Sequence, residues 1–406
     1  MHGIRTIIFI LEAEFTPRDY DRFGVETLRS HGFQVKVWDI SPVIHPEVHH
    51  PDSSSGSLST GGLVRKFLHR KDIRDAIGLL DRSDLVLCFI GYSLSTLFLY
   101  RSLSRKKIPY AVMVTNALPA VRRFTGTVRL DTPMKALRRM ADFLILRYYS
   151  LFGVEPAGIC LYGGETSLRG IPYPVDIEEG KTVCLPLHAF DYDTWLGMGN
   201  SATSPDEVFG VFLDGYDFYH LDLRRMGEPI PPWVEIYFSN LRTFFDHVEK
   251  TLGVRIIVAA HPLSHYTAVQ RTHFGERKVI QGKTAELVKR CRFVIVHAST
   301  AVNLAVLFQK PIIFITDHNY EKYPFGPYIE VMADELGKKL IYIDEPLDID
   351  WGRELAVDKA VYYSYRRSYI KSEGSPDLPY WEIFAHFLKA EKEPIRAKNE
   401  KQANTP

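Results

Sequence analysis

The feature that most constrains the fold of this chain is the stretch FVIVHASTAVNLAVLFQKPIIFI, residues 293–315. It opens with four consecutive β-branched or aromatic residues, 293–296, which is typical of a strand buried on both faces of a parallel sheet. Apolar residues at helical spacing follow over residues 301–308, and a second apolar strand spans residues 312–315. This order predicts a β-α-β unit, which requires a parallel sheet covered by helices.

The polar quartet HAST, residues 297–300, lies where the first of these strands ends and the helix begins. Ser299 and Thr300 are good N-cap residues, and in that role they only satisfy free backbone N–H groups. A helix start at the carboxyl end of a parallel strand is also a common phosphate site. On this stretch alone both interpretations stay open.

Strands alternate with helical segments along the rest of the chain. Further strands are predicted at residues 6–11, 34–38, 85–90, 110–114, 158–162, 182–187, 208–213, 255–260 and 340–343. Helices are predicted at residues 19–30, 233–252, 284–290, 353–370 and 380–390. The alternation indicates an α/β chain with two Rossmann-like, doubly wound domains.

A stretch containing Gly, Asn, Ser and Pro, residues 193–207, is the best candidate for a domain boundary. We therefore expect an N-terminal Rossmann-like domain at 1–195 on the acceptor side and a second domain at 196–375 on the donor side. Residues 376–406 should form a C-terminal helix and a polar tail. Two such domains bind small ligands in the cleft between the carboxyl ends of their strands.

Composition excludes several classes of function. Fifty basic residues against forty-nine acidic ones argue against broad nucleic-acid binding. The four cysteines are widely spaced and match no metal or disulfide pattern. His45, His49 and His50 fall in a polar stretch, 41–62, that is predicted to be a surface loop and not a metal site. The apolar start is interpreted as a first core strand, and no segment reaches membrane-spanning length, so a cytoplasmic protein is expected.

Three motifs in the C-terminal half follow predicted strands directly. They are Asp214-Gly215, His261-Pro262 and the quartet at 297–300. Each motif alone is weak, since Asp-Gly is usually a turn and Ser-Thr is usually a cap. The carboxyl ends of parallel strands meet at one edge of a sheet, however, so the three motifs together predict one shared site.

This ordered trio resembles that of bacterial GT-B glycosyltransferases that use CMP-activated sugars, such as sialyltransferases and Kdo transferases. The runs FLDGYDFYHLDL, AAHPLSHY, FGERKVIQGKTAELVK and VHASTAVNLAVLFQKPIIFIT also resemble surface-polysaccharide proteins near the retaining β-Kdo transferases. The resemblance covers residues 208–316 and is only architectural before them. It implies that His261, Ser299 and Thr300 hold the CMP phosphate and that Asp214 is the catalytic carboxylate.

Neighbouring residues complete the predicted donor site. Pro262 and His297 belong to the same motifs, and Gly215, His220 and Asp222 lie close enough to Asp214 to line the pocket. Lys283 and Thr284, in QGKTAEL, either contact the phosphate or cytidine or are a solvated lysine beside a helix cap. A single phosphate can be neutralised by such donors, so neither a metal nor any other cofactor is expected.

Two acidic motifs of the N-terminal half need separate interpretation. Glu165, in LYGGETSL, is either a second catalytic carboxylate facing Asp214 or a solvent-exposed turn residue. Asp191-Tyr192-Asp193 resembles a metal-binding Asp-x-Asp, but its place in the interdomain stretch favours a structural or acceptor-side role.

The segment 121–153 mixes Arg and Lys with large apolar residues. Such a face can rest on a membrane that carries a lipid-linked acceptor. The favoured interpretation is an amphipathic helix packed on the sheet, with arginines whose apolar stems cover it.

The sequence therefore predicts a glycosyltransferase that moves a Kdo-like ulosonic sugar from CMP to an oligosaccharide or lipid-linked surface glycan. Retention of configuration is expected, with Asp214 as nucleophile and Glu165 assisting. The alternatives are a UDP-sugar-dependent GT-B transferase or epimerase, and a catalytically silent GT-B relative that binds a glycan.

Overall fold

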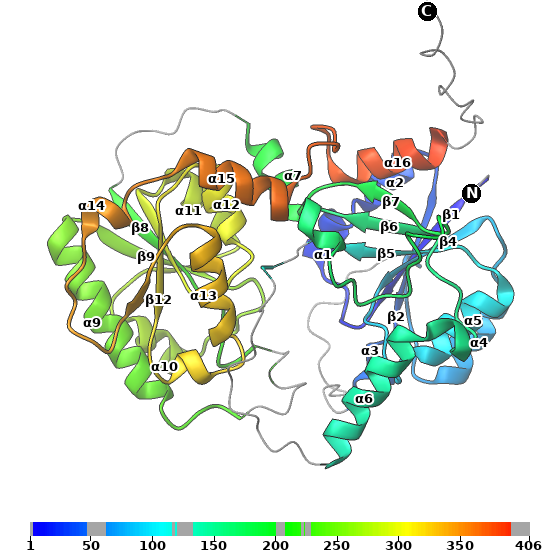
Figure 1. The fold of residues 1–406 in the computed structure, drawn as a ribbon, viewed down its shortest axis with the longest axis horizontal. Helices are drawn as coiled ribbons and strands as arrows, with labels where there is room; N and C mark the ends of the chain where they lie inside the picture. The colour runs from blue at the N-terminus through cyan, green and yellow to red at the C-terminus, as the bar shows by residue number, and fades with distance from the viewer. Residues whose placement is uncertain are drawn as a thin grey trace, which may run out of the picture.

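The computed structural model describes residues 3–46, 62–115, 118–119, 133–199, 208–220, 223 and 229–390. Most of the predicted polar loop, the first part of the basic-aromatic segment and the polar tail lie outside these residues. Figure 1 shows two α/β domains side by side, each built on one sheet with helices on its faces. This confirms the predicted pair of Rossmann-like domains.

The first sheet has seven strands, and every pairing within it is parallel. Its order is β3-β2-β1-β4-β5-β6-β7. The strand order reverses at β1, so the crevice between β1 and β4 is the topological switch point of this domain. The strands are β1 (Thr6–Leu11), β2 (Gln34–Asp39), β3 (Val64–Lys66), β4 (Asp84–Phe89), β5 (Tyr110–Val114), β6 (Ile159–Tyr162) and β7 (Val183–Pro186).

The second sheet has six strands, again all parallel, in the order β10-β9-β8-β11-β12-β13. Its switch point lies between β8 and β11. The strands are β8 (Phe209–Leu213), β9 (Arg255–Ala260), β10 (Val279–Gln281), β11 (Phe293–Val296), β12 (Ile312–Thr316) and β13 (Leu340–Tyr342). Sequence analysis missed β3 and β10, because three-residue edge strands carry too little hydrophobic pattern.

Helices cover both faces of each sheet (Figure 1). Around the first sheet they are α1 (Pro17–Arg22), α2 (Val25–Ser30), α3 (Ser41–Ile44), α4 (Arg70–Gly78), α5 (Leu97–Lys106), α6 (Pro133–Arg147), η1 (Tyr149–Phe152), η2 (Glu165–Leu168) and α7 (Phe190–Met198). Around the second sheet they are α9 (Val234–Leu252), α10 (Ala268–Arg271), η3 (Thr272–Phe274), α11 (Thr284–Arg290), α12 (Val302–Leu307), η4 (Tyr320–Lys322), α13 (Gly326–Glu335), α14 (Trp351–Glu354), α15 (Lys359–Tyr365) and η5 (Arg366–Ile370).

The last described helix, α16 (Tyr380–Ala390), returns to the first domain and packs against α2 (Figure 1). Trp381 is buried in the first core, and its Nε1 donates to the carbonyl of Arg22 at 2.7 Å. The predicted single helix 19–30 is interrupted at Gly24, which has a φ of +53°. A Cβ on Gly24 would lie 2.3 Å from Trp381, so the break makes room for the indole.

The carboxyl ends of the two sheets border the same interdomain region. Leu118, which follows β5, and Ala189, which follows β7, both pack with the hydrophobic cluster that fills the second domain. From the other side Asn303 in α12, just beyond β11, donates to Asp191 in α7 at 3.0 Å. Ligands of doubly wound sheets bind at such edges, so this region is where a site is expected.

Candidate functional site

Asp214 follows β8 directly and lies at the switch point of the second sheet. Leu213 is in register with Ala259 of β9 and with Val296 of β11, so the three strands end at nearly the same level. The Oδ1 atom of Asp214 accepts a hydrogen bond from the backbone N–H of Tyr216 at 3.1 Å. Its Oδ2 atom accepts one from the hydroxyl of Tyr266 at 2.9 Å.

The environment of Asp214 makes it a stronger base than an ordinary carboxylate. Burial raises its pKa to about 6, although hydrogen bonds from the Tyr216 N–H, the Tyr266 hydroxyl and the His261 N–H lower it in part. A carboxyl group with this pKa is mostly ionised at neutral pH and can still accept a proton. It is therefore suited to act as a general base or as a nucleophile.

A second carboxyl group, Asp217, lies in the same loop and was missed in the sequence. Burial raises its pKa to about 7, and the charge of Asp214 adds to the effect. A Cβ on Gly215 would lie 2.2 Å from the Oδ1 atom of Asp217, so only glycine allows this carboxyl to fold back over the loop. Tyr216 between them has a φ of +57°, an unusual conformation for a residue with a side chain.

His297 lies beneath this loop and not in the open site. Its side chain is 3% exposed, its Nε2 lies 2.6 Å from the hydroxyl of Tyr237, and its Nδ1 lies 3.8 Å from Oδ2 of Asp217. Burial lowers its pKa to about 3, so the ring is neutral. Because the ring is covered, the predicted direct contact between His297 and a sugar donor does not fit this structure, and its Nδ1 has no hydrogen-bond partner among the described residues.

The loop after β9 holds His261-Pro262 next to Asp214. The Nδ1 atom of His261 accepts from the N–H of Leu263 at 3.2 Å, which leaves the proton of the neutral ring on Nε2. The side-chain amide of Gln281, at the end of β10, lies 3.2 Å from the carbonyl of His261 and 2.8 Å from that of Pro262. These contacts fix the loop beside Asp214.

Among the residues predicted to line the pocket next to Asp214 and His261, His220 lies beside His261. Its ring centroid lies 5.1 Å from that of His261, at an interplanar angle of 76°. Asp222 lies outside the described residues. Lys283 is exposed and Thr284 half-buried at the start of α11, one loop beyond Gln281. Both residues therefore lie at the same end of the sheet as His261, but next to its outermost strand, β10.

Ser299 and Thr300 are half-buried at the end of β11. The N-cap of α12 is Ala301, which has no side-chain cap, and the Oγ atom of Ser299 accepts from the N–H of Ala301 at 3.3 Å. Neither hydroxyl therefore caps the helix in the usual way, in which a side chain accepts from the second or third helical N–H. This arrangement leaves the interpretation as ligand donors open.

Glu165 does not join the carboxyl groups of the second domain by any described contact. It begins η2, after β6, and its Oε1 accepts from Nε of Arg367 at 2.7 Å. Arg367 belongs to η5, the segment that leads from the second domain back to the first, and both side chains are more than a third exposed. Glu165 is thus an exposed residue that is ion-paired with η5, and its expected place opposite Asp214 stays a prediction.

Asp191-Tyr192-Asp193 holds segments together. Asp191 accepts from Asn303, the hydroxyl of Tyr192 donates to Asp377 at 2.7 Å, and Asp193 accepts from the N–H of Tyr380 at 2.8 Å. Three consecutive residues in the first turn of α7 thus connect it to α12 and to the start of α16. This agrees with the structural role that the sequence favoured over a metal site.

No family model matches the chain, and no curated protein matches its sequence. Among solved structures, the UDP complex of MnaA from S. aureus matches with a TM-score of 0.50 and 11% identity, covering 96% of this chain and 97% of that chain. The chain has the GT-B fold. The glycotransferase of kitacinnamycin gives a TM-score of 0.49 at 13% identity, over 96% and 99% of the two chains. MurG of Acinetobacter baumannii gives 0.47 at 10% identity, over 95% and 99%.

In this GT-B chain a His–carboxylate pair also lies at the switch point of the first sheet. Glu12 follows β1 directly, and its Oε2 atom lies 3.1 Å from Nε2 of His45, which ends α3 after β2. Both side chains are partly exposed, at 33% and 20%. The pairing could not be recognised from sequence spacing, because the two residues lie 33 positions apart in the chain.

The helix α6 carries an apolar face that is exposed. Leu137, Met140, Phe143 and Leu144 are each more than 40% exposed, whereas Ile145 is buried. The favoured prediction that such side chains pack on the sheet is therefore wrong for these four. Three arginines, Arg138, Arg139 and Arg147, are exposed on the same helix. In the described part of the chain, no helix combines the length and the apolar character needed to span a bilayer.

Proposed function

We propose that this GT-B protein is a glycosyltransferase that uses a nucleotide-activated sugar. The observation that carries the proposal is Asp214, a carboxyl group with a pKa of about 6 at the switch point of the second sheet. It is surrounded by loops that offer hydrogen-bond donors. Such a group beside a phosphate-binding edge can act on the anomeric carbon of a donor sugar or on the hydroxyl that attacks it.

The second domain binds the donor in this proposal. The Nε2–H of His261 and the hydroxyls of Ser299 and Thr300 neutralise the phosphate that leaves with the nucleotide, with Lys283 at the periphery. Donors of this kind stabilise the charge that develops on the leaving phosphate without a divalent metal. The protonated fraction of Asp217 provides an acid next to Asp214 near neutral pH.

The first domain binds the acceptor. Glu12 contacts the imidazole of His45 at the carboxyl edge of the first sheet. An imidazole oriented by a carboxylate is a suitable base for an acceptor hydroxyl at neutral pH. We therefore assign proton removal from the acceptor to His45 in the mechanism in which Asp214 is the nucleophile; where Asp214 itself takes that proton, His45 only orients the acceptor.

Two classes of donor are candidates. The ordered strand-end motifs favour a CMP-linked ulosonic sugar such as Kdo, which has one phosphate to neutralise. A UDP-sugar, for transfer or for epimerisation, is the second candidate, because the S. aureus protein that matches along the whole chain was solved with UDP. A UDP-sugar has a second phosphate and needs more neutralising groups at the same edge.

Asp214 can act in two ways, and the products differ in configuration. As a nucleophile it bonds to the anomeric carbon while the bond to the phosphate oxygen breaks, and the acceptor oxygen then displaces it with net retention. As a general base it takes the acceptor proton during one inverting displacement. Glu165, the residue expected to assist a retaining reaction, forms an ion pair with Arg367, so the expectation of retention rests on the resemblance to the retaining β-Kdo transferases.

The exposed apolar face of α6 favours an acceptor that is held at a membrane. Four large apolar side chains flanked by arginines match an interface with anionic lipid headgroups, in which apolar groups enter the acyl boundary and cations stay at the phosphates. The acceptor we propose is accordingly a lipid-linked glycan.

The test of the proposed function is donor turnover by wild type and by Asp214→Asn. Incubation with CMP-Kdo, and separately with UDP-N-acetylglucosamine, should release free nucleotide from one donor, and Asp214→Asn should lower the rate at least about a hundredfold. Asp334→Asn, an exposed carboxyl on α13, is the matched control and should keep the wild-type rate. Nucleotide binding without turnover of either donor would instead indicate a catalytically silent glycan-binding relative.

A further inference from the structure

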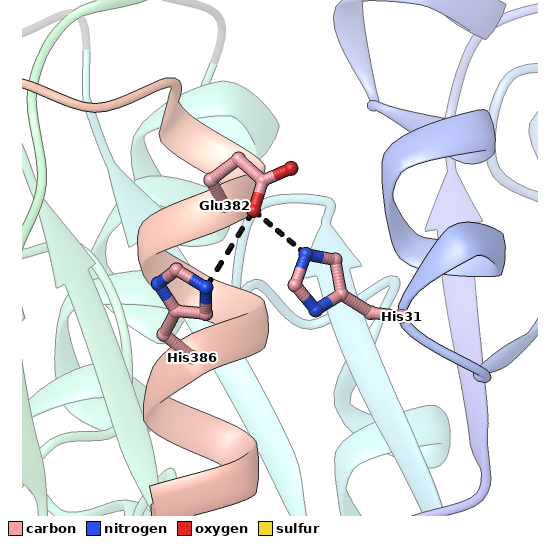
Figure 2. A group of neighbouring side chains, drawn as sticks. All are labelled: His31, Glu382 and His386. Carbon is pink, nitrogen blue, oxygen red and sulfur yellow. Dashed lines mark hydrogen bonds and ion pairs between the residues drawn. The ribbon is translucent and has the colours of Figure 1, made fainter.

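Two histidines and a glutamate converge on the outer face of the first domain, where α16 packs against α2 (Figure 2). Glu382 and His386 are one helical turn apart on α16, and His31 directly follows α2. The Oε2 atom of Glu382 lies 2.6 Å from Nε2 of His31 and 3.7 Å from Nε2 of His386. Figure 2 shows both imidazoles directed toward the same carboxylate oxygen.

Two nitrogens and one carboxylate oxygen are the donor set that zinc and similar divalent transition metals prefer. The ligand atoms of the three residues all lie within 4.8 Å of one another. Donors about 2.0–2.2 Å from a tetrahedral zinc are roughly 3.4 Å apart, so side-chain movements of roughly 1 Å would bring all three to one ion. The spacing of four residues on α16 places two of the ligands on one helical face.

The surroundings leave the imidazoles available for a metal. In the described part of the chain, the buried Nδ1 atom of His31 has no hydrogen-bond partner, and its Nε2 shares with Glu382 a proton that a bound metal would displace. His31 and Glu382 are 15% and 32% exposed, and His386 is 57% exposed. The site is thus closed on the side of the protein and open to water on the other, which leaves room for a fourth ligand from solvent.

We propose that His31, Glu382 and His386 form a binding site for a divalent transition metal, zinc by preference. The site is structural, because it joins α16 to α2 on the outer face of the first domain, and none of its residues contacts Asp214, His261 or Ser299. Next to it, Trp381 fills the space above Gly24. A metal here would fasten the C-terminal helix to the domain on which it packs, and stabilise the folded chain by the free energy of binding.

The experiment measures thermal unfolding of the full chain. Protein treated with EDTA and dialysed is titrated with ZnCl₂, and with CoCl₂ to read the absorption of a four-coordinate site. Zinc should raise the Tm of wild type in a saturable way, while His31→Ala and His386→Ala should each weaken zinc binding by at least about tenfold. His69→Ala, an exposed histidine of the same domain, is the matched control and should behave as wild type.

Absence of a saturable shift in wild type would overturn the proposal. So would equal zinc shifts in His31→Ala, His386→Ala and wild type, since the metal would then bind elsewhere. Both variants should fold without metal, because His386 is exposed and His31 only ends a short helix; their apo Tm values check this directly. Donor turnover is expected to be the same with EDTA as with zinc, so loss of the metal site and loss of the proposed function are separable results.

Discussion

The Tyr266 hydroxyl donates a hydrogen bond of 2.9 Å to the Oδ2 atom of Asp214 and thereby connects the loop after β9 to the carboxylate that ends β8. Burial raises the pKa of Tyr266, so the hydroxyl keeps its proton and remains a donor. The contact stabilises the ionised form of Asp214 and holds it toward the loop that contains His261.

Tyr266→Phe removes this donor and should raise the pKa of Asp214 further. A hydrogen bond to a carboxylate is worth about 1–2 kcal/mol, so the acidic limb of the pH–rate profile should move from about 6 upward by roughly one pH unit. The profile of donor turnover between pH 4.5 and 9 measures the shift. Tyr363→Phe, an exposed tyrosine on α15, is the control, and an unmoved limb in Tyr266→Phe would show that Asp214 is not the titrating group.

Asp217→Asn should stabilise the protein at alkaline pH. The carboxyl has a pKa of about 7 in the folded chain against an ordinary value of 3.8, so its folded-state pKa is raised. Below pH 3.8 this carboxyl is protonated in both the folded and the unfolded chain, so it does not change the free energy of unfolding. Between pH 3.8 and 7 it ionises only in the unfolded chain, so the free energy of unfolding falls by about 1.4 kcal/mol for each pH unit.

The amide in Asp217→Asn avoids this cost. The free energy of unfolding in urea should increase by about 1–4 kcal/mol at pH 8 and change little at pH 4. Asp334→Asn serves as the exposed control. A variant that is destabilised equally at both pH values would mean that Asp217 is stabilising through its contacts and is not held in an unfavourable charged state.

His45→Gln should separate acceptor chemistry from donor binding. If His45 removes the acceptor proton, its replacement should lower transfer to acceptor by about 10²- to 10⁴-fold and leave nucleotide affinity unchanged. Glu12→Gln should give a smaller loss, because the imidazole remains but is held less firmly. His69→Gln is the control; transfer at the wild-type rate in His45→Gln would remove His45 from the mechanism.

The face of α6 should bind anionic membranes. Wild-type protein should float with vesicles that contain phosphatidylglycerol, and flotation should weaken as salt is raised, since the arginines contribute electrostatic attraction. The double variant Phe143→Ser, Leu144→Ser should lose most of this binding. Ile236→Ser on α9, an equally exposed apolar residue of the second domain, should keep it. Equal flotation of both variants would locate the membrane contact elsewhere.

Much of the fold can be predicted from local hydrophobic patterns in the sequence. Strands such as β1, β5 and β11 are continuous apolar runs, and their order along the chain predicts parallel sheets without any knowledge of tertiary contacts. The break at Gly24 could not be predicted in this way, because its cause is Trp381, which lies more than 350 residues later in the chain. The same limit applies to His31 and Glu382, which are 351 positions apart.

In the candidate site, too, features set by local sequence could be predicted and features set by tertiary contacts could not. The positions of Asp214 and His261 at the edge of the sheet could be predicted because each follows an apolar strand, and the end of a parallel strand has a known place in the sheet. Asp217 was missed because its properties come from burial over Gly215, which is a tertiary effect. The ion pair of Glu165 could not be predicted, because its partner, Arg367, comes from a segment that returns from the other domain.

The most direct test of the account is calorimetric titration of the full chain with CMP and with UDP. One of these nucleotides should bind, and His261→Ala and Ser299→Ala should each weaken its binding by about 1–3 kcal/mol, or roughly 5- to 150-fold. The controls His69→Ala and Ser239→Ala should bind as wild type does. No binding of either nucleotide, or equal affinities in His261→Ala, Ser299→Ala and wild type, would contradict the claim that a nucleotide sits at the ends of β8, β9 and β11.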